Sequence, residues 1–75
     1  MILPSKHLPA DKSLLASGGV LLRHVIRPTT VSSLWDRVKE IPEISSFNRF
    51  VLALDLLYLV GAVTMEDGLI RRAKA

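Results

Sequence analysis

The sequence predicts a mainly α-helical, winged-helix-like domain of three helices and a small C-terminal β-hairpin, preceded by an extended N-terminal arm. Apolar residues recur at helical spacing in three stretches, and each stretch follows a residue that can cap a helix. Asp67-Gly68 is a strong signal for a two-residue hairpin turn and stands between two short runs that suit strands. The predicted boundaries are 1–11 for the arm, 12–71 for the domain and 72–75 for a loose tail.

The first eleven residues are predicted to be extended, because Pro4 and Pro9 disfavour helix at the residues before them. A first helix then runs from Lys12 to about Ile26, where leucines and valines recur at three-, four- and seven-residue spacings. Gly18 falls on this apolar stripe. We expect either close approach of a neighbouring backbone at this position or a kink in the helix.

Arg27-Pro28 ends the first helix, and Thr30 caps a second one from Val31 to about Glu40. Trp35 shares its apolar side with aliphatic residues rather than basic ones. The sequence therefore predicts a core position for this ring and not a platform on which nucleic-acid bases stack.

Ser46 can cap a third helix from Phe47 to about Val60, and Gly61 marks its end. The chain then enters the hairpin at Val63. Its return strand is predicted from Leu69 to Arg71.

The stretch FVLALDLLYLVGAV, residues 50–63, is the most apolar part of the chain but carries a carboxylate, Asp55, in its middle. A bilayer span needs about 20 apolar residues, and this run has 14 positions with a charge inside. A core helix with two apolar faces is the better interpretation. The N-terminal residues also lack the continuous apolar segment of a secretory signal, so we expect a cytoplasmic protein.

The third helix is expected to bury one face and expose another. At about 100° per residue, one arc suffices to form the core; it consists of Phe47, Phe50, Val51, Leu54, Leu57 and Tyr58. A second stripe lies on the opposite side and is flanked by polar residues. It consists of Leu52, Leu56 and Leu59.

This second stripe predicts an interface. A homodimer seam, a contact with another subunit and cover by the N-terminal arm would each remove it from water. Asp55 is either a solvated residue at the boundary of the two faces or a charge that pairs with a partner and fixes register. The predicted protein-interface residues are Ile2, Leu3, Arg49, Leu52, Asp55, Leu56 and Leu59.

DNA recognition by the third helix is disfavoured, because the helix that enters the major groove of a winged-helix protein needs polar or basic readers. Its outer side offers leucines and a carboxylate instead. The net charge of +3 leaves DNA contact open elsewhere, and Arg71, Arg72 and Lys74 are predicted to lie near DNA.

Catalysis is not predicted. The chain has no cysteine, and neither His7 nor His24 has the spaced carboxylate or second histidine of a metal site. No phosphate-binding glycine loop is present, and no serine has a recognisable base. We therefore expect no enzyme activity, cofactor, metal or small-molecule substrate.

Five stretches that together span almost the whole chain carry a resemblance to a known family. They are MILPSKHL, SLLASGG, TVSSLWDRV, FNRFVLALDLLYLVGAV and EDGLIRR. In these features the chain resembles the small middle components of bacterial ABC-three-component conflict systems, most closely middle component 6.

The resemblance implies a small subunit encoded between an ABC- or SMC-type ATPase and an effector, often a nuclease, in systems similar to the Lamassu antiphage defences. It further implies an adapter that connects the two and restrains the effector, with DNA reached indirectly through the complex. The alternative is a stand-alone winged-helix DNA-binding regulator that uses Arg49, Arg71, Arg72 and Lys74.

Overall fold

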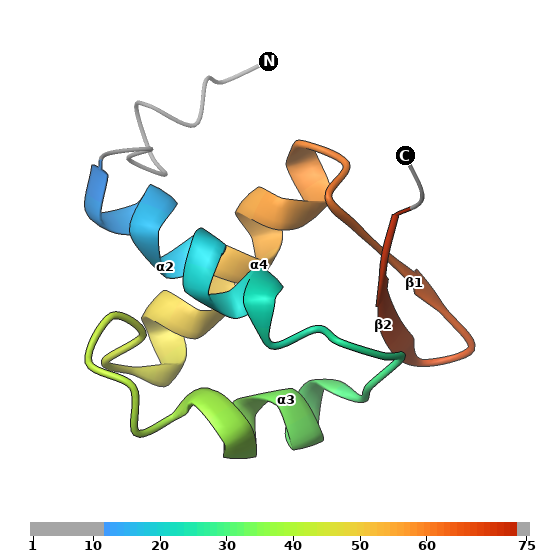
Figure 1. Cartoon of the computed structure of the whole chain (residues 1–75), viewed down its shortest axis with the longest axis horizontal. Coiled ribbons are helices and arrows are strands. Elements are labelled where there is room, and N and C mark those ends of the chain that lie inside the picture. The colour runs from blue at the N-terminus through green and yellow to red at the C-terminus, as the bar shows by residue number, and fades with distance from the viewer. Residues whose placement is uncertain (1–11, 74–75) are drawn as a thin grey trace.

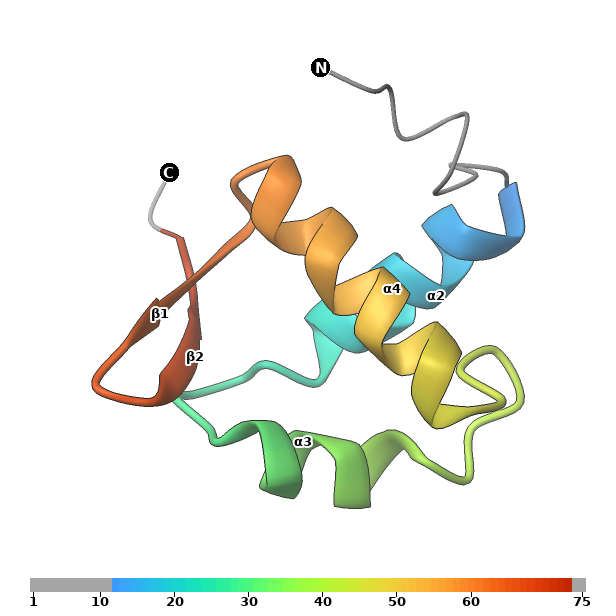
Figure 2. The same ribbon diagram turned by 180° about the vertical axis from the view of Figure 1, so that it is seen from behind.

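Three helices and a two-stranded hairpin make up the fold. The computed structural model describes residues 12–73. The elements are α2 (Lys12–Arg23), α3 (Val31–Val38), α4 (Phe47–Leu59), β1 (Val63–Glu66) and β2 (Leu69–Arg72). Figure 1 shows α2 and α4 crossing, with α3 beneath them and the hairpin to one side, and Figure 2 shows α4 in front of α2. The predicted mainly helical fold with three helices and a C-terminal hairpin is confirmed, and the predicted extended arm over residues 1–11 lies outside the described residues.

Two predicted caps begin the later helices. Thr30 is extended, and its side chain accepts a hydrogen bond of 3.1 Å from the Ser33 backbone N–H at the start of α3. Ser46 does the same for α4, where the Arg49 backbone N–H donates to its hydroxyl over 3.1 Å. Because these bonds satisfy donors that a helix leaves unpaired, α3 and α4 begin where the sequence predicted.

The end of α4 and the hairpin turn need left-handed backbone. Gly61 has φ of 77°, its N–H donates to the carbonyl of Tyr58, and the next N–H donates to the carbonyl of Leu57. This pair of bonds is the Schellman motif that ends many helices. Asp67 and Gly68 both have positive φ, 54° and 76°, as a two-residue type I′ turn requires, and Glu66 pairs with Leu69 across it.

One residue of the connection between α2 and α3 pairs with the hairpin, as a third strand would. Thr29 forms an antiparallel bridge with Ile70 of β2 through two backbone bonds of 3.0 and 2.7 Å. Helix, bridge, helix, helix and hairpin is an order compatible with a winged-helix-like domain. This extended residue also explains why α2 ends at Arg23 and not at the predicted Ile26, since the chain must leave the helix to reach β2.

The predicted tail began at Arg72, and this boundary is wrong. Arg72 belongs to β2, and its guanidinium donates to the carbonyls of Val25 and Leu22, each over 2.9 Å. The next residue donates its backbone N–H to the carbonyl of Ala62. A long-range contact of this kind joins residues 50 positions apart and leaves no periodic signal in the sequence.

A second arginine holds the same end of α2. Arg37 of α3 donates to the His24 carbonyl over 3.4 Å and to the Thr29 hydroxyl over 3.1 Å. Carbonyls at a helix C-terminus lack partners within the helix and carry partial negative charge, so cations suit them. Arg37 and Arg72 together therefore fix the end of α2 to α3 and to the hairpin.

The core lies between α2 and α4 and is closed below by α3 and the loop after it. Its buried apolar residues are Leu14, Val20, Leu21, Val25, Leu34, Val38, Ile44, Phe50, Ala53, Leu54, Leu56, Leu57, Val63 and Ile70. Within residues 12–73 no helix is long and apolar enough to cross a bilayer.

Replacing Arg72 by Ala should lower the free energy of unfolding by about 1–2 kcal/mol, because two carbonyls at the end of α2 lose a charged donor. Urea unfolding followed by circular dichroism measures this change. Arg71→Ala is the matched control, since its hydrogen-bond partner is the exposed Glu66 carboxylate, and such a pair contributes less than about 1 kcal/mol. Equal losses from both variants would contradict the structural role assigned to Arg72.

Candidate functional site

Most residues of the predicted protein interface lie on α4, and they differ in their exposure to solvent. Asp55 is exposed, Leu52 is half-buried against the core, and Leu59 is 60% exposed. Ile2 and Leu3 lie outside the described residues and remain predictions.

Leu56 does not lie on an outer face. It is only 7% exposed and belongs to the core, so its predicted place in the second stripe is wrong. A Cβ built on Gly18 of α2 would lie 3.6 Å from the nearest methyl groups of Leu56 and Leu57. The neighbours of Gly18 are therefore two leucine side chains at an ordinary van der Waals distance, and not a backbone as expected.

The outward surface of α4 is a row of residues four positions apart. This row, called the α4 outer row below, consists of Phe47, Val51, Asp55 and Leu59. Phe47 is 53% exposed and Val51 37% exposed, although both were predicted to lie in the core. The helix is rotated about its axis relative to the prediction, because Ala53 and Leu56 are buried while Phe47 and Val51 are exposed. The signal that was missed is Ala53, which belongs to neither predicted stripe and is fully buried, so it marks the inward side of α4.

Aromatic rings anchor the beginning of this row. Trp35 lies edge-on to Phe47, with ring centroids 5.1 Å apart, and it is tilted against the buried Phe50 at 5.2 Å. Such pairs contribute about 0.5–1.5 kcal/mol beyond the area that they bury. Trp35 is half-buried and packs against the core, and it holds Phe47 in a fixed position at the surface.

Arg49 lies on another side of α4 and points toward α2. Its guanidinium is 3.5 Å from the hydroxyl of Ser17, which is fully buried. The Ser17 hydroxyl also lies 2.6 Å from the carbonyl of Glu43, in the loop before α4. Arg49 thus joins a contact between α2, this loop and α4, and this engagement makes it a poor candidate for a free charge at the rim of an interface.

Two of the three residues predicted to lie near DNA are on the hairpin. Arg71 pairs with Glu66 over 2.8 Å, and Arg72 is held by the end of α2. Lys74 lies outside the described residues. The two arginines are exposed, but each already has a partner within its own domain.

Tyr58 carries a polar atom without a partner. Its hydroxyl oxygen is buried and has no hydrogen bond within the described part of the chain. Burial, and then the nearby Asp55 carboxylate, raise the pKa of this hydroxyl above its ordinary value. The phenol therefore stays neutral over the physiological range.

No candidate active site emerges from the described residues. Between positions 12 and 73, no three His, Cys, Asp or Glu side chains come together in a way that could hold a metal ion. His24 has its Nδ1 2.9 Å from the Val20 carbonyl, and because a carbonyl can only accept, this nitrogen carries the proton. The ring thus has a local structural role at the end of α2.

A family model decides the identity of the chain. The model for the ABC-three-component system middle component 6 matches residues 3–73, which is nearly the full sequence. The chain belongs to this family. It is therefore a middle component of an ABC-three-component system, as the resemblance implied. No curated protein and no solved structure matches the sequence significantly.

For this middle component 6 protein, the sites of Leu56 and Leu59 should respond very differently to truncation. Leu56→Ala should lower the free energy of unfolding by about 2–5 kcal/mol, because it leaves a cavity beside Gly18. Leu59→Ala should change it by no more than about 0.5 kcal/mol. Urea unfolding of both variants tests the assignment, and a small loss at Leu56 would contradict its place in the core.

Tyr58→Phe should leave stability at neutral pH unchanged or raise it by up to about 1 kcal/mol, since the hydroxyl removed has no partner in the described structure. The raised pKa means that the folded state holds the phenol proton more tightly than the unfolded state. The folding stability that this tighter proton binding contributes is fully present below about pH 10, the ordinary pKa of tyrosine. It is lost as the pH rises through the raised pKa of the folded state.

Wild-type stability should therefore fall more steeply above pH 10 than that of the Phe variant. Tyr58 is the only tyrosine, so the absorbance of its phenolate reports its ionisation directly. A midpoint at or below the value of an unstructured tyrosine would contradict the assigned environment.

Proposed function

We propose that this protein is a non-catalytic adapter that links an ABC- or SMC-type ATPase to an effector, which we expect to be a nuclease, in a cytoplasmic antiphage defence complex. The observation that carries the proposal is the α4 outer row. Membership of a middle-component family makes partner subunits expected. The α4 outer row places three exposed apolar residues along one helix and gives one of these partners a surface to bind.

The chemistry of the row suits a helical partner. Phe47, Val51 and Leu59 present apolar side chains four and eight positions apart, so they follow the spacing by which helices pack in grooves and against one another. Asp55 interrupts the row with one exposed carboxylate. A Lys or Arg of the partner placed opposite Asp55 would fix the register between the two helices more than it would raise their affinity.

The N-terminal residues remain part of the proposal. Ile2 and Leu3 are apolar and precede α2 by about ten positions. We infer that they extend the contact with a partner, and their removal offers a second way to weaken it.

The alternative, a stand-alone winged-helix DNA-binding regulator that uses Arg49, Arg71, Arg72 and Lys74, has less support. The Arg49 guanidinium points to Ser17 of α2. The outward row of α4, the helix that would enter the major groove, contains three apolar residues and a carboxylate. Asp55 would also repel phosphate.

Replacing two members of the row should break the complex while keeping the fold. Val51→Gln/Leu59→Gln removes exposed apolar surface with a good helix former, so α4 should persist. We expect the tagged variant to lose the ATPase or the effector when it is co-expressed with the products of the genes beside its own. Co-elution, light scattering and mass spectrometry provide the measurement.

The matched control is Ile26→Gln/Met65→Gln, which replaces two exposed apolar residues that lie outside α4. It should assemble normally. Undiminished assembly of the α4 variant would place the interface elsewhere, whereas a wild-type chain that co-elutes with neither partner would contradict the adapter role itself. A wild-type mass twice that of the chain would instead assign the row to a homodimer.

A further inference from the structure

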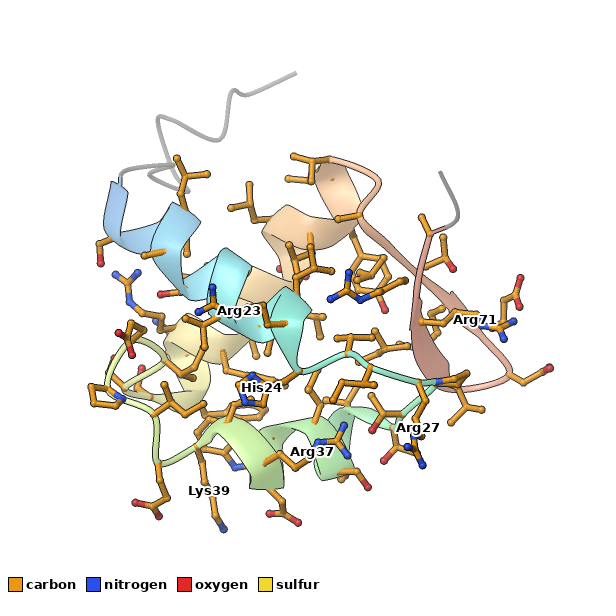
Figure 3. The ribbon with its side chains drawn as sticks, viewed as in Figure 1. Arg23, His24, Arg27, Arg37, Lys39 and Arg71 are labelled. Carbon is orange, nitrogen blue, oxygen red and sulfur yellow. The ribbon has the colours of Figure 1, made fainter. Side chains whose placement is uncertain are left out.

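A second surface of this protein is basic and lies away from the α4 outer row. Its residues come from four segments: the end of α2, the connection after it, α3 with its cap, and β2. Figure 3 labels all of them but Arg72 in the view in which α2 lies in front of α4, and Arg72 is bonded to the end of α2. This basic face consists of Arg23, Arg27, Arg37, Lys39, Arg71 and Arg72.

Two of these cations are held in place by neutral groups. The guanidinium groups of Arg37 and Arg72 donate to backbone carbonyls at the end of α2, and a carbonyl does not cancel their charge. They are therefore fixed positive charges that lose little side-chain freedom when an anion binds.

Two others are free to bind. Arg23 and Arg27 are exposed, and neither guanidinium has a hydrogen bond or ion pair within residues 12–73. Lys39 and Arg71 form exposed ion pairs with Asp36 and Glu66, and exposed pairs of this kind contribute little and exchange readily for another anion.

The face is also hollowed. A groove of about 450 Å³ runs between the α2–α3 connection and the hairpin, and three arginines line it: Arg27, Arg71 and Arg72. Glu66 is the one carboxylate in its lining, and Arg71 pairs with it. The groove thus has an excess of positive charge along its walls.

We propose that the basic face binds the phosphodiester backbone of nucleic acid without reading its base sequence. Dispersed cations around a shallow groove match a line of phosphates, which are the main source of sequence-independent affinity. An acidic protein surface fits less well, because protein interfaces need aromatic or aliphatic anchors. Ile26 is the only large exposed apolar residue in the groove lining.

This inference does not rest on the adapter role. The two surfaces use different residues and lie on different helices, so a variant of one should leave the other intact. A middle component built in this way would hold a protein with α4 and a nucleic acid with the opposite side.

The test is binding of the purified full-length chain to a short labelled DNA duplex, followed by fluorescence anisotropy across a salt series. Arg23→Gln/Arg27→Gln should weaken binding at least about tenfold at low salt and make the slope of log K against log salt shallower by about 2. Two duplexes of unrelated sequence should bind equally. A duplex RNA of the same length distinguishes a general backbone contact from one that needs the DNA geometry.

The control is Ser45→Asp/Asn48→Asp, at the beginning of α4. Each double variant changes the net charge by −2, from +3 to +1, so a general charge effect would weaken both equally. We expect the control to bind the duplex with the wild-type affinity at low salt. Its slope of log K against log salt should differ from the wild-type slope by less than about one phosphate contact.

Three results would overturn the proposal. The first is a wild-type chain that binds neither duplex at low salt, and the second is an equal loss in the control. The third is an Arg23→Gln/Arg27→Gln variant that still binds nucleic acid but no longer co-elutes with a protein subunit, which would assign the basic face to an acidic protein.

Discussion

The close crossing of α2 and α4 at Gly18 is the contact on which the rest of the structure depends. Leu56 and Leu57 pack over Gly18, where an added Cβ would lie 3.6 Å from a methyl group of each, an ordinary van der Waals distance. With Leu56 packed in this way, α4 turns Phe47 and Val51 toward water. A larger side chain at this position would have to push the helices apart.

The middle and the last turn of α2 are held by different means. Ser17, one residue before Gly18, is fully buried and is bonded to the loop that precedes α4. The last turn is held instead by Arg37 and Arg72, which come from later elements. A domain of this size has little core from which to gain stability, so such polar contacts at the edge of the core matter more than in a larger protein.

Two sides of the domain carry different kinds of side chain. The α4 outer row carries apolar groups and one carboxylate, and the side formed by α2, α3 and β2 carries arginines. Exposed apolar rows favour protein partners, and dispersed cations favour polyanions. A single small chain that presents both is suited to joining other molecules, which accords with a middle component of a multi-subunit system.

The sequence by itself determined the helices, the caps and the turn. The two caps, Thr30 and Ser46, bond to backbone groups three residues away, and the turn at Asp67-Gly68 depends on its own backbone angles. Local chemistry therefore suffices to place them. Family membership also followed from the sequence, because motifs along nearly the whole chain carry it. The tertiary structure alone decided the burial of Leu56, the exposure of the α4 outer row and the role of Arg72. Each depends on a neighbour distant in the chain, and helical periodicity shows that a face is apolar without showing which neighbour covers it.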